Sequence, residues 1–266
     1  MKDQAYTLRK LANNEVKSQY SMNILNKSSN KPCSVISLIS AEKKAGKSNL
    51  IVNLAAGIEN INKKILIIEL ADSKRGILNS IINTDNIEEV ENHTNYKKHK
   101  YFQNIDIITD VIFKDTEGKV NIKSFINKIK AENIYDYILI DTDYALDYLA
   151  IGMMVESDKI LLVSKPKQSA ITESYLLIKS LAKSSIPEKI SVIINGAYND
   201  KEAYELFLNL NKTTLRFLNI AIRYVGCTNI VNKIGYYNSI KEPIYIQDAE
   251  TIYKSNIDKI IENIIT

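Results

Sequence analysis

The sequence predicts a three-layer α/β fold, in which a mostly parallel β-sheet lies between two layers of helices. Short continuous apolar runs alternate with longer amphipathic segments over residues 34–266. This alternation is typical of buried parallel strands that are connected by helices. Hydrophobic residues make up 45% of the 266 residues and charged residues 25%, which are ordinary values for a globular protein. A chain of this length can bury a large core.

The expected elements follow one another in a regular order. Apolar runs suited to buried strands lie at Val35–Ile39, Ile65–Leu70, Ile105–Ile108, Tyr137–Ile140, Ile160–Val163, Ile190–Ile194 and Ala221–Val225. Helical patterns lie between them, at Lys47–Ile61, Ile122–Ala131, Ile171–Leu181 and Lys201–Leu215. Residues 84–103 are polar, and we expect them to be irregular. We expect His93 and His99, which lie in this stretch, to belong to a solvated loop rather than to a metal site.

Each end of the chain shows a helical pattern. Residues 1–20 form a short N-terminal helix, with Ala5, Leu8, Leu11 and Ala12 on one face, and residues 21–33 form a polar linker before the domain at 34–266. A helix this short is marginal alone in water. Its apolar face therefore packs either on a partner protein or on its own domain, and these physical alternatives are about equal.

The C-terminal pattern at Asp248–Thr266 predicts a helix that packs on the core. Its apolar face consists of Ala249, Ile252, Tyr253, Ile257, Ile260, Ile261 and Ile264. The four acidic residues of the segment outnumber its two lysines, whereas anionic lipids favour a basic polar face. Membrane contact is therefore expected to be weak or indirect.

The composition excludes several classes of function. The net charge of +4 is too small to argue for nucleic-acid binding. Cys33 and Cys227 have no metal-binding or redox spacing, which suits a reducing cytoplasm. The chain has no signal peptide and no apolar run that could span a bilayer. Glycine is scarce, with 8 residues where average usage gives roughly 19.

The stretch Ser34–Ile58 predicts a phosphate-binding loop between a strand and a helix. Its loop ends in Gly46-Lys47-Ser48, the last part of a P-loop motif. In such a loop backbone N–H groups surround the phosphates, the lysine contacts the terminal phosphates and the hydroxyl binds Mg²⁺. Asp141 follows the apolar run Tyr137–Ile140 and is the candidate second Mg²⁺ ligand. ATP and Mg²⁺ are therefore the expected cofactors, with Lys43 and Lys44 as further loop residues that contact the nucleotide.

Three further segments show a resemblance to a known family. The N-terminus reads Asp3-Gln4-Ala5-Tyr6-Thr7-Leu8-Arg9, residues Ser164–Lys179 read SKPKQSAITESYLLIK, and residues Arg216–Cys227 read RFLNIAIRYVGC. The chain resembles the MinD/ParA family of deviant Walker A ATPases, and within it the FlhG branch. That branch has a DQAxxLR segment, a TTPEPTSITDAYALIK segment and an RFL…LGY segment. The similarity covers nearly the whole chain.

The resemblance implies a partner for the N-terminal helix. In FlhG proteins the DQAxxLR helix binds the GTPase FlhF and stimulates GTP hydrolysis, which regulates flagellar placement and number. Gln4 would help to order the attacking water, because an amide can accept from water and donate to a phosphate oxygen. Asp3 and Arg9 would pair with charges of the partner, and Ala5 and Leu8 would pack against it. Flagellar switch or C-ring proteins are further expected partners, with recruitment to the membrane or the flagellar base.

The resemblance also shows where the chain departs from the family around the triphosphate. The family loop KGGxGK[ST] is replaced here by EKKAGKS, so that Glu42 stands in place of the lysine that reaches across the family's dimer. Lys43 and Lys44 replace both glycines. Ala71 stands where the family has the second Asp of DxD, and Asp143 replaces the first glycine of DTGAG. These degenerate positions predict weak or absent ATP hydrolysis and a monomer. Asn195 matches the family's adenine-contacting asparagine, although a turn residue before Gly196 is an equally good interpretation.

Two alternative functions remain open from the sequence. The first is a working ATP-dependent switch that dimerises and visits the membrane, which Lys47, Ser48 and Asp141 favour. The second is a ParA-like DNA-partitioning ATPase, which would need a basic DNA-binding face and would leave residues 3–9 unexplained.

Overall fold

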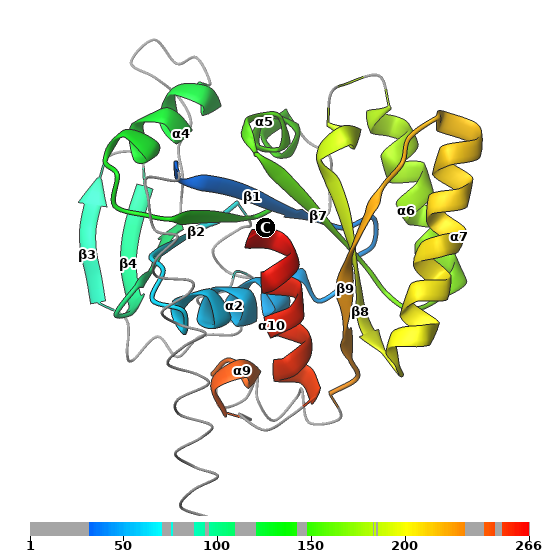
Figure 1. Ribbon diagram of the computed structural model, residues 1–266. Coiled ribbons are helices and arrows are strands. Elements are labelled where there is room, and N and C mark those ends of the chain that lie inside the picture. Colours follow the sequence, from blue (N-terminus) through cyan, green and yellow to red (C-terminus); the bar gives the residue numbers. More distant parts are fainter. Residues whose placement is uncertain are drawn as a thin grey trace, which may run out of the picture. The chain divides into compact units, whose positions relative to one another are not determined.

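A nine-stranded sheet forms the centre of the described residues, in the strand order β3-β4-β5-β2-β6-β1-β7-β8-β9. The computed structural model describes residues 32–70, 76, 88–93, 96–109, 121–142, 148–182, 184, 186–231, 242–247 and 252–265. The central and right-hand strands of Figure 1 pair in parallel, from β5 through to β9. The predicted α/β class with a mostly parallel sheet is therefore confirmed.

The strands and helices alternate along the chain. The strands are β1 (Ser34–Ile39), β2 (Ile65–Glu69), β3 (Glu88–His93), β4 (Tyr96–Phe102), β5 (Ile105–Thr109), β6 (Tyr137–Asp141), β7 (Lys159–Ser164), β8 (Ile190–Ala197) and β9 (Arg223–Asn229). The helices are α2 (Lys47–Glu59), α4 (Ile122–Ala131), α5 (Tyr148–Glu156), α6 (Gln168–Leu181), α7 (Asp200–Leu218), α9 (Ile244–Gln247) and α10 (Ile252–Ile265).

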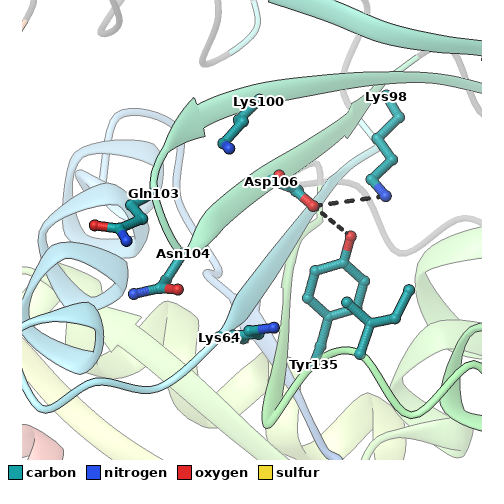
Figure 2. A pocket seen from close by; sticks show the side chains of 8 residues that line it. Lys64, Lys98, Lys100, Gln103, Asn104, Asp106 and Tyr135 are labelled. Atoms are coloured by element: carbon teal, nitrogen blue, oxygen red, sulfur yellow. Dashed lines mark hydrogen bonds and ion pairs between the residues drawn. The ribbon is translucent and has the colours of Figure 1, made fainter.

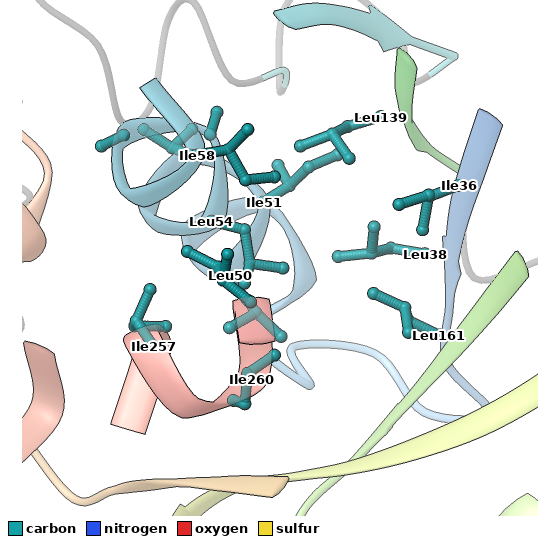
Figure 3. Packing of buried hydrophobic residues seen from close by; sticks show 14 of the residues in the cluster. Ile36, Leu38, Leu50, Ile51, Leu54, Ile58, Leu139, Leu161, Ile257 and Ile260 are labelled. Atoms are coloured by element: carbon teal, nitrogen blue, oxygen red, sulfur yellow. The ribbon is translucent and has the colours of Figure 1, made fainter. Parts of the chain in front are cut away.

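Alternate residues of the central strands face two different helix layers. In β1, Ile36 and Leu38 pack in the cluster that contains α2 and α10, which Figure 3 shows from close by. Val35 and Ile39 point to the other face, into the clusters formed with α4 and α5 and with α6 and α7. Both faces of the sheet are buried because parallel strands carry helical connections on both sides, which explains why these strands read as continuous apolar runs.

The edge hairpin β3–β4 corrects the expectation for residues 84–103. We predicted an irregular polar stretch, but β4 pairs antiparallel with both β3 and β5. The hairpin is polar because it lies at the sheet edge, where apolar side chains are not needed on both faces. His99 is half-buried and its Nε2 lies 3.2 Å from the Thr109 hydroxyl oxygen, so the solvated-loop prediction is wrong. No metal-binding group of three or more His, Cys, Asp or Glu residues occurs in the described part of the chain.

Strand β9 and helix α5 also differ from the sequence prediction. The last strand, β9, begins at Arg223 and ends at Asn229, so it starts two residues later and extends four residues further than predicted. Its interior carries Gly226 at φ 149 and the polar residue Thr228, which hid its true extent. Helix α5 was not predicted, because its sequence YLAIGMMVE is apolar nearly all round and gives little helical periodicity.

The C-terminal helix packs against the core, as the sequence predicts. Tyr253, Ile257, Ile260, Ile261 and Ile264 of α10 are buried beside α2. The helix begins at Ile252, whose side chain is 69% exposed and so does not share the predicted apolar face. In the part of the chain that the structure describes, no helix combines the length and the apolar character needed to cross a membrane.

The contact between α2 and α10 predicts one stability effect. A Cβ added at Gly57 of α2 would lie 2.4 Å from Cδ1 of Ile261 and 3.2 Å from the ring of Tyr245. Gly57→Leu is therefore expected to destabilise the fold by about 1–3 kcal/mol, because the core has no space for the added atoms. Urea denaturation followed by circular dichroism measures this change. An unaltered midpoint would contradict the close approach of the two helices.

Candidate nucleotide site

The loop between β1 and α2 lies at the carboxyl end of the central strands. β1 and β6 are neighbours, with Leu38 opposite Asp141, and β2 places Glu69 opposite the same aspartate. Residues that follow these strands therefore gather at one end of the sheet, where ligands bind in open α/β folds. Helix α2 begins directly after the loop, with Gly46 as its N-cap residue and no acidic side chain in its first turn. Such a helix start favours an anion.

Lys47, Ser48 and Asp141 meet at this end of the sheet. The Ser48 hydroxyl donates a hydrogen bond of 2.7 Å to Oδ2 of Asp141. The Lys47 ammonium donates to the backbone carbonyl of Thr142, and it lies 4.0 Å from Oδ1 of Asp141. Asp141 is only 4% exposed. The structure thus brings together the lysine, the hydroxyl and the carboxylate that the sequence singled out, while their binding role stays a prediction.

These side chains fit the group that the sequence predicts. A hydroxyl and a carboxylate are the hard oxygen ligands that Mg²⁺ prefers. The Lys47 ammonium lies beside them at the start of α2, where it can contact a phosphate. The residues of this chain could therefore hold Mg²⁺ through Ser48 and Asp141, and phosphate through Lys47 and the loop backbone.

Asn195 of β8 holds the loop between β1 and α2 by a hydrogen bond to its backbone. Its Nδ2 donates to the carbonyl of Ala45 at 2.7 Å, and its Oδ1 accepts a hydrogen bond from the hydroxyl of Thr228 at 2.5 Å. Gly46 has φ +85, and a Cβ there would lie 2.3 Å from Nδ2 of Asn195. Since β8 continues to Ala197, Asn195 is a strand residue and not a turn residue. The adenine contact stays a prediction.

Glu42 is held by a lysine that the sequence analysis missed. Its Oε2 lies 2.8 Å from the Nζ of Lys167, which is the N-cap residue of α6. The Glu42 side chain is 10% exposed, and its buried Oε1 has no hydrogen-bond partner in the described residues. The hydrogen bond from Lys167 to this carboxylate raises the pKa of the lysine. The carboxylate is thus bound within its own chain.

A signal for Lys167 was present in the sequence. The segment Ser164–Lys179 aligns with TTPEPTSITDAYALIK, which has a glutamate where Lys167 stands. Glu42 likewise stands where the family loop has a lysine. This chain therefore has a glutamate and a lysine where the family has a lysine and a glutamate, so the sign of both charges is exchanged. Reading the two departures jointly would have predicted the contact.

Lys44 has a backbone conformation that glycine adopts more readily than other residues. Its φ is +60, in the left-handed region, which costs an ordinary residue roughly 1–2 kcal/mol. Lys44 and Lys43 are both exposed. The loop therefore has, at Lys44, a positive φ that glycine would adopt at lower cost.

Replacing Lys44 with glycine should stabilise the protein. We expect Lys44→Gly to raise the free energy of unfolding by about 0.5–1 kcal/mol, because relief of the left-handed strain exceeds the entropy lost with glycine. Lys43→Gly is the matched control: Lys43 is not among the positive-φ residues, so this change should be neutral or destabilising. Chemical denaturation measures both, and an equal effect of the two changes would contradict the strain.

Several predicted site residues lie outside the described residues. These are Asp3, Gln4, Ala5, Leu8 and Arg9 at the N-terminus, together with Ala71 and Asp143. Of the residues before Ala71, Glu69 is described and is 2% exposed. Gly76 lies against it, since a Cβ there would be 2.4 Å from both carboxylate oxygens of Glu69. A buried carboxylate therefore lies one strand away from Asp141.

Comparison with known proteins gives one relative and a clear fold. No family model matches the chain. The antiactivator FleN of Pseudomonas aeruginosa is 30% identical over 114 residues, which span 43% of this chain and 39% of FleN. A chain of the MinC:MinD cell division protein complex from Aquifex aeolicus superposes with a TM-score of 0.68 and 21% identity, covering 88% of this chain and 96% of that one. MinD from Pyrococcus horikoshii, solved with Mg-ADP, gives a TM-score of 0.60 at 18% identity, covering 87% and 96%. The fold implied by the resemblance is therefore confirmed, and the similarity to FleN covers 114 residues.

Proposed function

We propose that this protein, which has the fold of MinD and resembles FlhG of the MinD/ParA family, is a nucleotide-binding regulator with little or no ATPase activity. The observation that carries the proposal is the contrast within one loop. Lys47, Ser48 and Asp141 are in contact, as a site for ATP and Mg²⁺ requires. At the position where the family has a lysine that reaches a second subunit, this chain has Glu42, which forms an ion pair with its own Lys167.

The charge at Glu42 argues against efficient hydrolysis. Catalysis of phosphoryl transfer depends on cations and donors placed where negative charge develops. A carboxylate near a triphosphate repels it, and the ion pair with Glu42 already engages Lys167. The chain would therefore hold ATP with the groups of α2 and β6, while lacking the charge that the family supplies from a second subunit.

The partner proposed for this regulator is an FlhF-type GTPase. The support is the Asp3–Arg9 segment, which matches DQAxxLR at every fixed position, together with the similarity to FleN. Gln4 would assist GTP hydrolysis in the partner, with Asp3 and Arg9 holding the helix and Ala5 and Leu8 packing. The regulator would act in flagellar placement and number, at the membrane or the flagellar base, where switch or C-ring proteins are further partners.

A second candidate is a working ATP-dependent switch. The contact between Ser48 and Asp141 favours it, because it places the two candidate Mg²⁺ ligands together. Such a switch would hydrolyse ATP and dimerise, and MinD from Pyrococcus horikoshii was solved with Mg-ADP. The two candidates agree on binding and disagree on turnover.

Calorimetric titration with ATP and Mg²⁺ tests the proposal. We expect saturable binding without phosphate release over the same period, and no binding heat with Lys47→Ala, which removes the ammonium from the site. Lys63→Ala is the control and should retain binding, because Lys63 lies before the amino end of β2 and pairs with Asp136. Absence of binding in the wild type would overturn the nucleotide-binding part, and rapid phosphate release would favour the switch. The thermal midpoint of each variant confirms that it is folded.

A further inference from the structure

A polar pocket of about 230 Å³ lies at the amino ends of β2, β5 and β6. The phosphate loop lies at the opposite end of the parallel strands, beyond the carboxyl end of β1. Its position follows from the parallel strands: Lys64 directly precedes β2, Asn104 directly precedes β5 and Tyr135 lies just before β6. Residues of β4 complete the wall (Figure 2). The lining residues are Lys64, Lys98, Lys100, Gln103, Asn104, Asp106, Ile134 and Tyr135.

One side of the pocket is fixed by a compensated charge cluster. Asp106 accepts a hydrogen bond of 2.6 Å from the Tyr135 hydroxyl, and its carboxylate lies 3.6 Å from the Lys98 ammonium. The same ammonium lies 5.6 Å from the centre of the Tyr135 ring. Figure 2 shows these three side chains directed at one another. Lys98 and Asp106 are largely buried, so this wall is preformed and nearly neutral.

The two other lysines of the pocket, Lys64 and Lys100, are exposed. No ion pair joins either of them to a carboxylate whose side chain the structure describes, and Glu88 and Asp106 are the register partners of Lys100 on the neighbouring strands. The nearby Asp136 is used by Lys63, whose Nζ lies 3.0 Å from its Oδ1, and it accepts the backbone N–H of Lys64 at 2.9 Å. Glu59 accepts the backbone N–H of Asn104 at 3.4 Å. Asp136, Asp106 and Glu59 are therefore engaged by other groups, and Lys64 and Lys100 remain available to an anion.

We propose that this pocket binds the phosphate group of a small molecule, between the ammonium groups of Lys64 and Lys100. A phosphate monoester carries about −1.5 to −2 charges at pH 7, which suits a pocket lined by three lysines and one aspartate. Gln103 and Asn104 line the same pocket, and their side-chain amides are neutral donors. Ile134, 42% exposed, offers an apolar wall for the rest of the molecule. The site is separate from the phosphate loop and does not depend on its function.

Nuclear magnetic resonance of the ¹⁵N-labelled full chain tests this site. Lys47→Ala serves as the background, so that the phosphate loop does not contribute, and the backbone amides of Gln103 and Asn104 report binding. The probes are inorganic phosphate and glycerol 1-phosphate, with acetate at equal ionic strength as the reference. We expect saturable shifts of these amides with both phosphates and not with acetate.

Matched lysine variants decide the assignment. Lys64→Ala and Lys100→Ala should each weaken phosphate binding roughly tenfold, as expected for loss of one charge-assisted hydrogen bond. Lys63→Ala is the control, because Lys63 pairs with Asp136 and does not line the pocket. Lys64→Gln and Lys100→Gln repeat the test with longer side chains, should a variant with alanine fail to fold. Equal shifts with acetate, unchanged affinity in the Lys64 and Lys100 variants, or equal weakening by Lys63→Ala would overturn the proposal.

Discussion

A peptide of residues 2–20 is expected to stimulate GTP hydrolysis by an FlhF-type GTPase from the same organism, without the rest of the chain. A helix with a narrow apolar face suits a groove on another protein. The polar linker predicted at residues 21–33 would allow the predicted helix to dock away from the P-loop domain. Stimulation then requires only the groups that the helix itself carries, namely the Gln4 amide and the charges of Asp3 and Arg9.

Two substitutions in the peptide separate binding from catalysis. Gln4→Ala should reduce maximal stimulation on the order of 10²-fold while leaving affinity nearly unchanged, because it removes one contact made in the transition state. Leu8→Ala should instead weaken binding by roughly 1–3 kcal/mol if the side chain is buried in the complex. GTP turnover titrated with peptide measures both. Full activity of Gln4→Ala, or stimulation by the full chain but not by the peptide, would refute the role of this helix.

ATP hydrolysis by the wild-type chain is expected not to exceed that of Lys47→Ala. Loss of one preorganised electrostatic contact costs about 10²–10³ in rate, and this loop differs from the family at Glu42, Lys43 and Lys44 together. Phosphate release from purified protein measures the rate, and the variant supplies the background. Turnover well above that background would show that the loop hydrolyses ATP by another arrangement.

The Glu42–Lys167 ion pair determines how family-like behaviour can be restored. Glu42→Lys alone would place a second ammonium beside Lys167, where the two like charges repel. We therefore expect this single change to destabilise the loop, and Glu42→Lys with Lys167→Glu to recover the stability. Adding Lys43→Gly and Lys44→Gly should then produce ATP-dependent dimerisation, measured by light scattering after size-exclusion chromatography. Equal behaviour of the single and the paired change would show that the contact is unimportant.

The fold was predictable wherever burial determines the sequence. Strands such as β2 and β7 are buried on both faces, so nearly every residue is apolar and the run is visible. Helix α4 was predicted to the residue because one face is apolar and the other charged. The edge hairpin β3–β4 was not predicted because its strands are polar and lack an apolar run. Helix α5 was not predicted because it is apolar nearly all round and lacks helical periodicity.

The site was predictable as far as motifs extend. Lys47, Ser48 and Asp141 were found because their spacing relative to a strand and a helix is characteristic. The contacts of Asn195 with Ala45 and of Lys167 with Glu42 join residues that are more than 100 positions apart. Local pattern cannot reveal such pairs. The lysines of the polar pocket likewise come from β4 and from the residue before β2, and these segments are neighbours only because of the strand order of the sheet.

The packing of Asn195 on Gly46 offers a structural reason for the presence of Gly46-Lys47-Ser48 in this chain. Any side chain at position 46 would collide with Asn195, Lys47 binds a backbone carbonyl, and Ser48 binds Asp141. Each retained residue of the motif thus has an internal partner that would be lost on substitution. These contacts give Gly46, Lys47 and Ser48 a structural role in the fold in addition to any role in binding ATP.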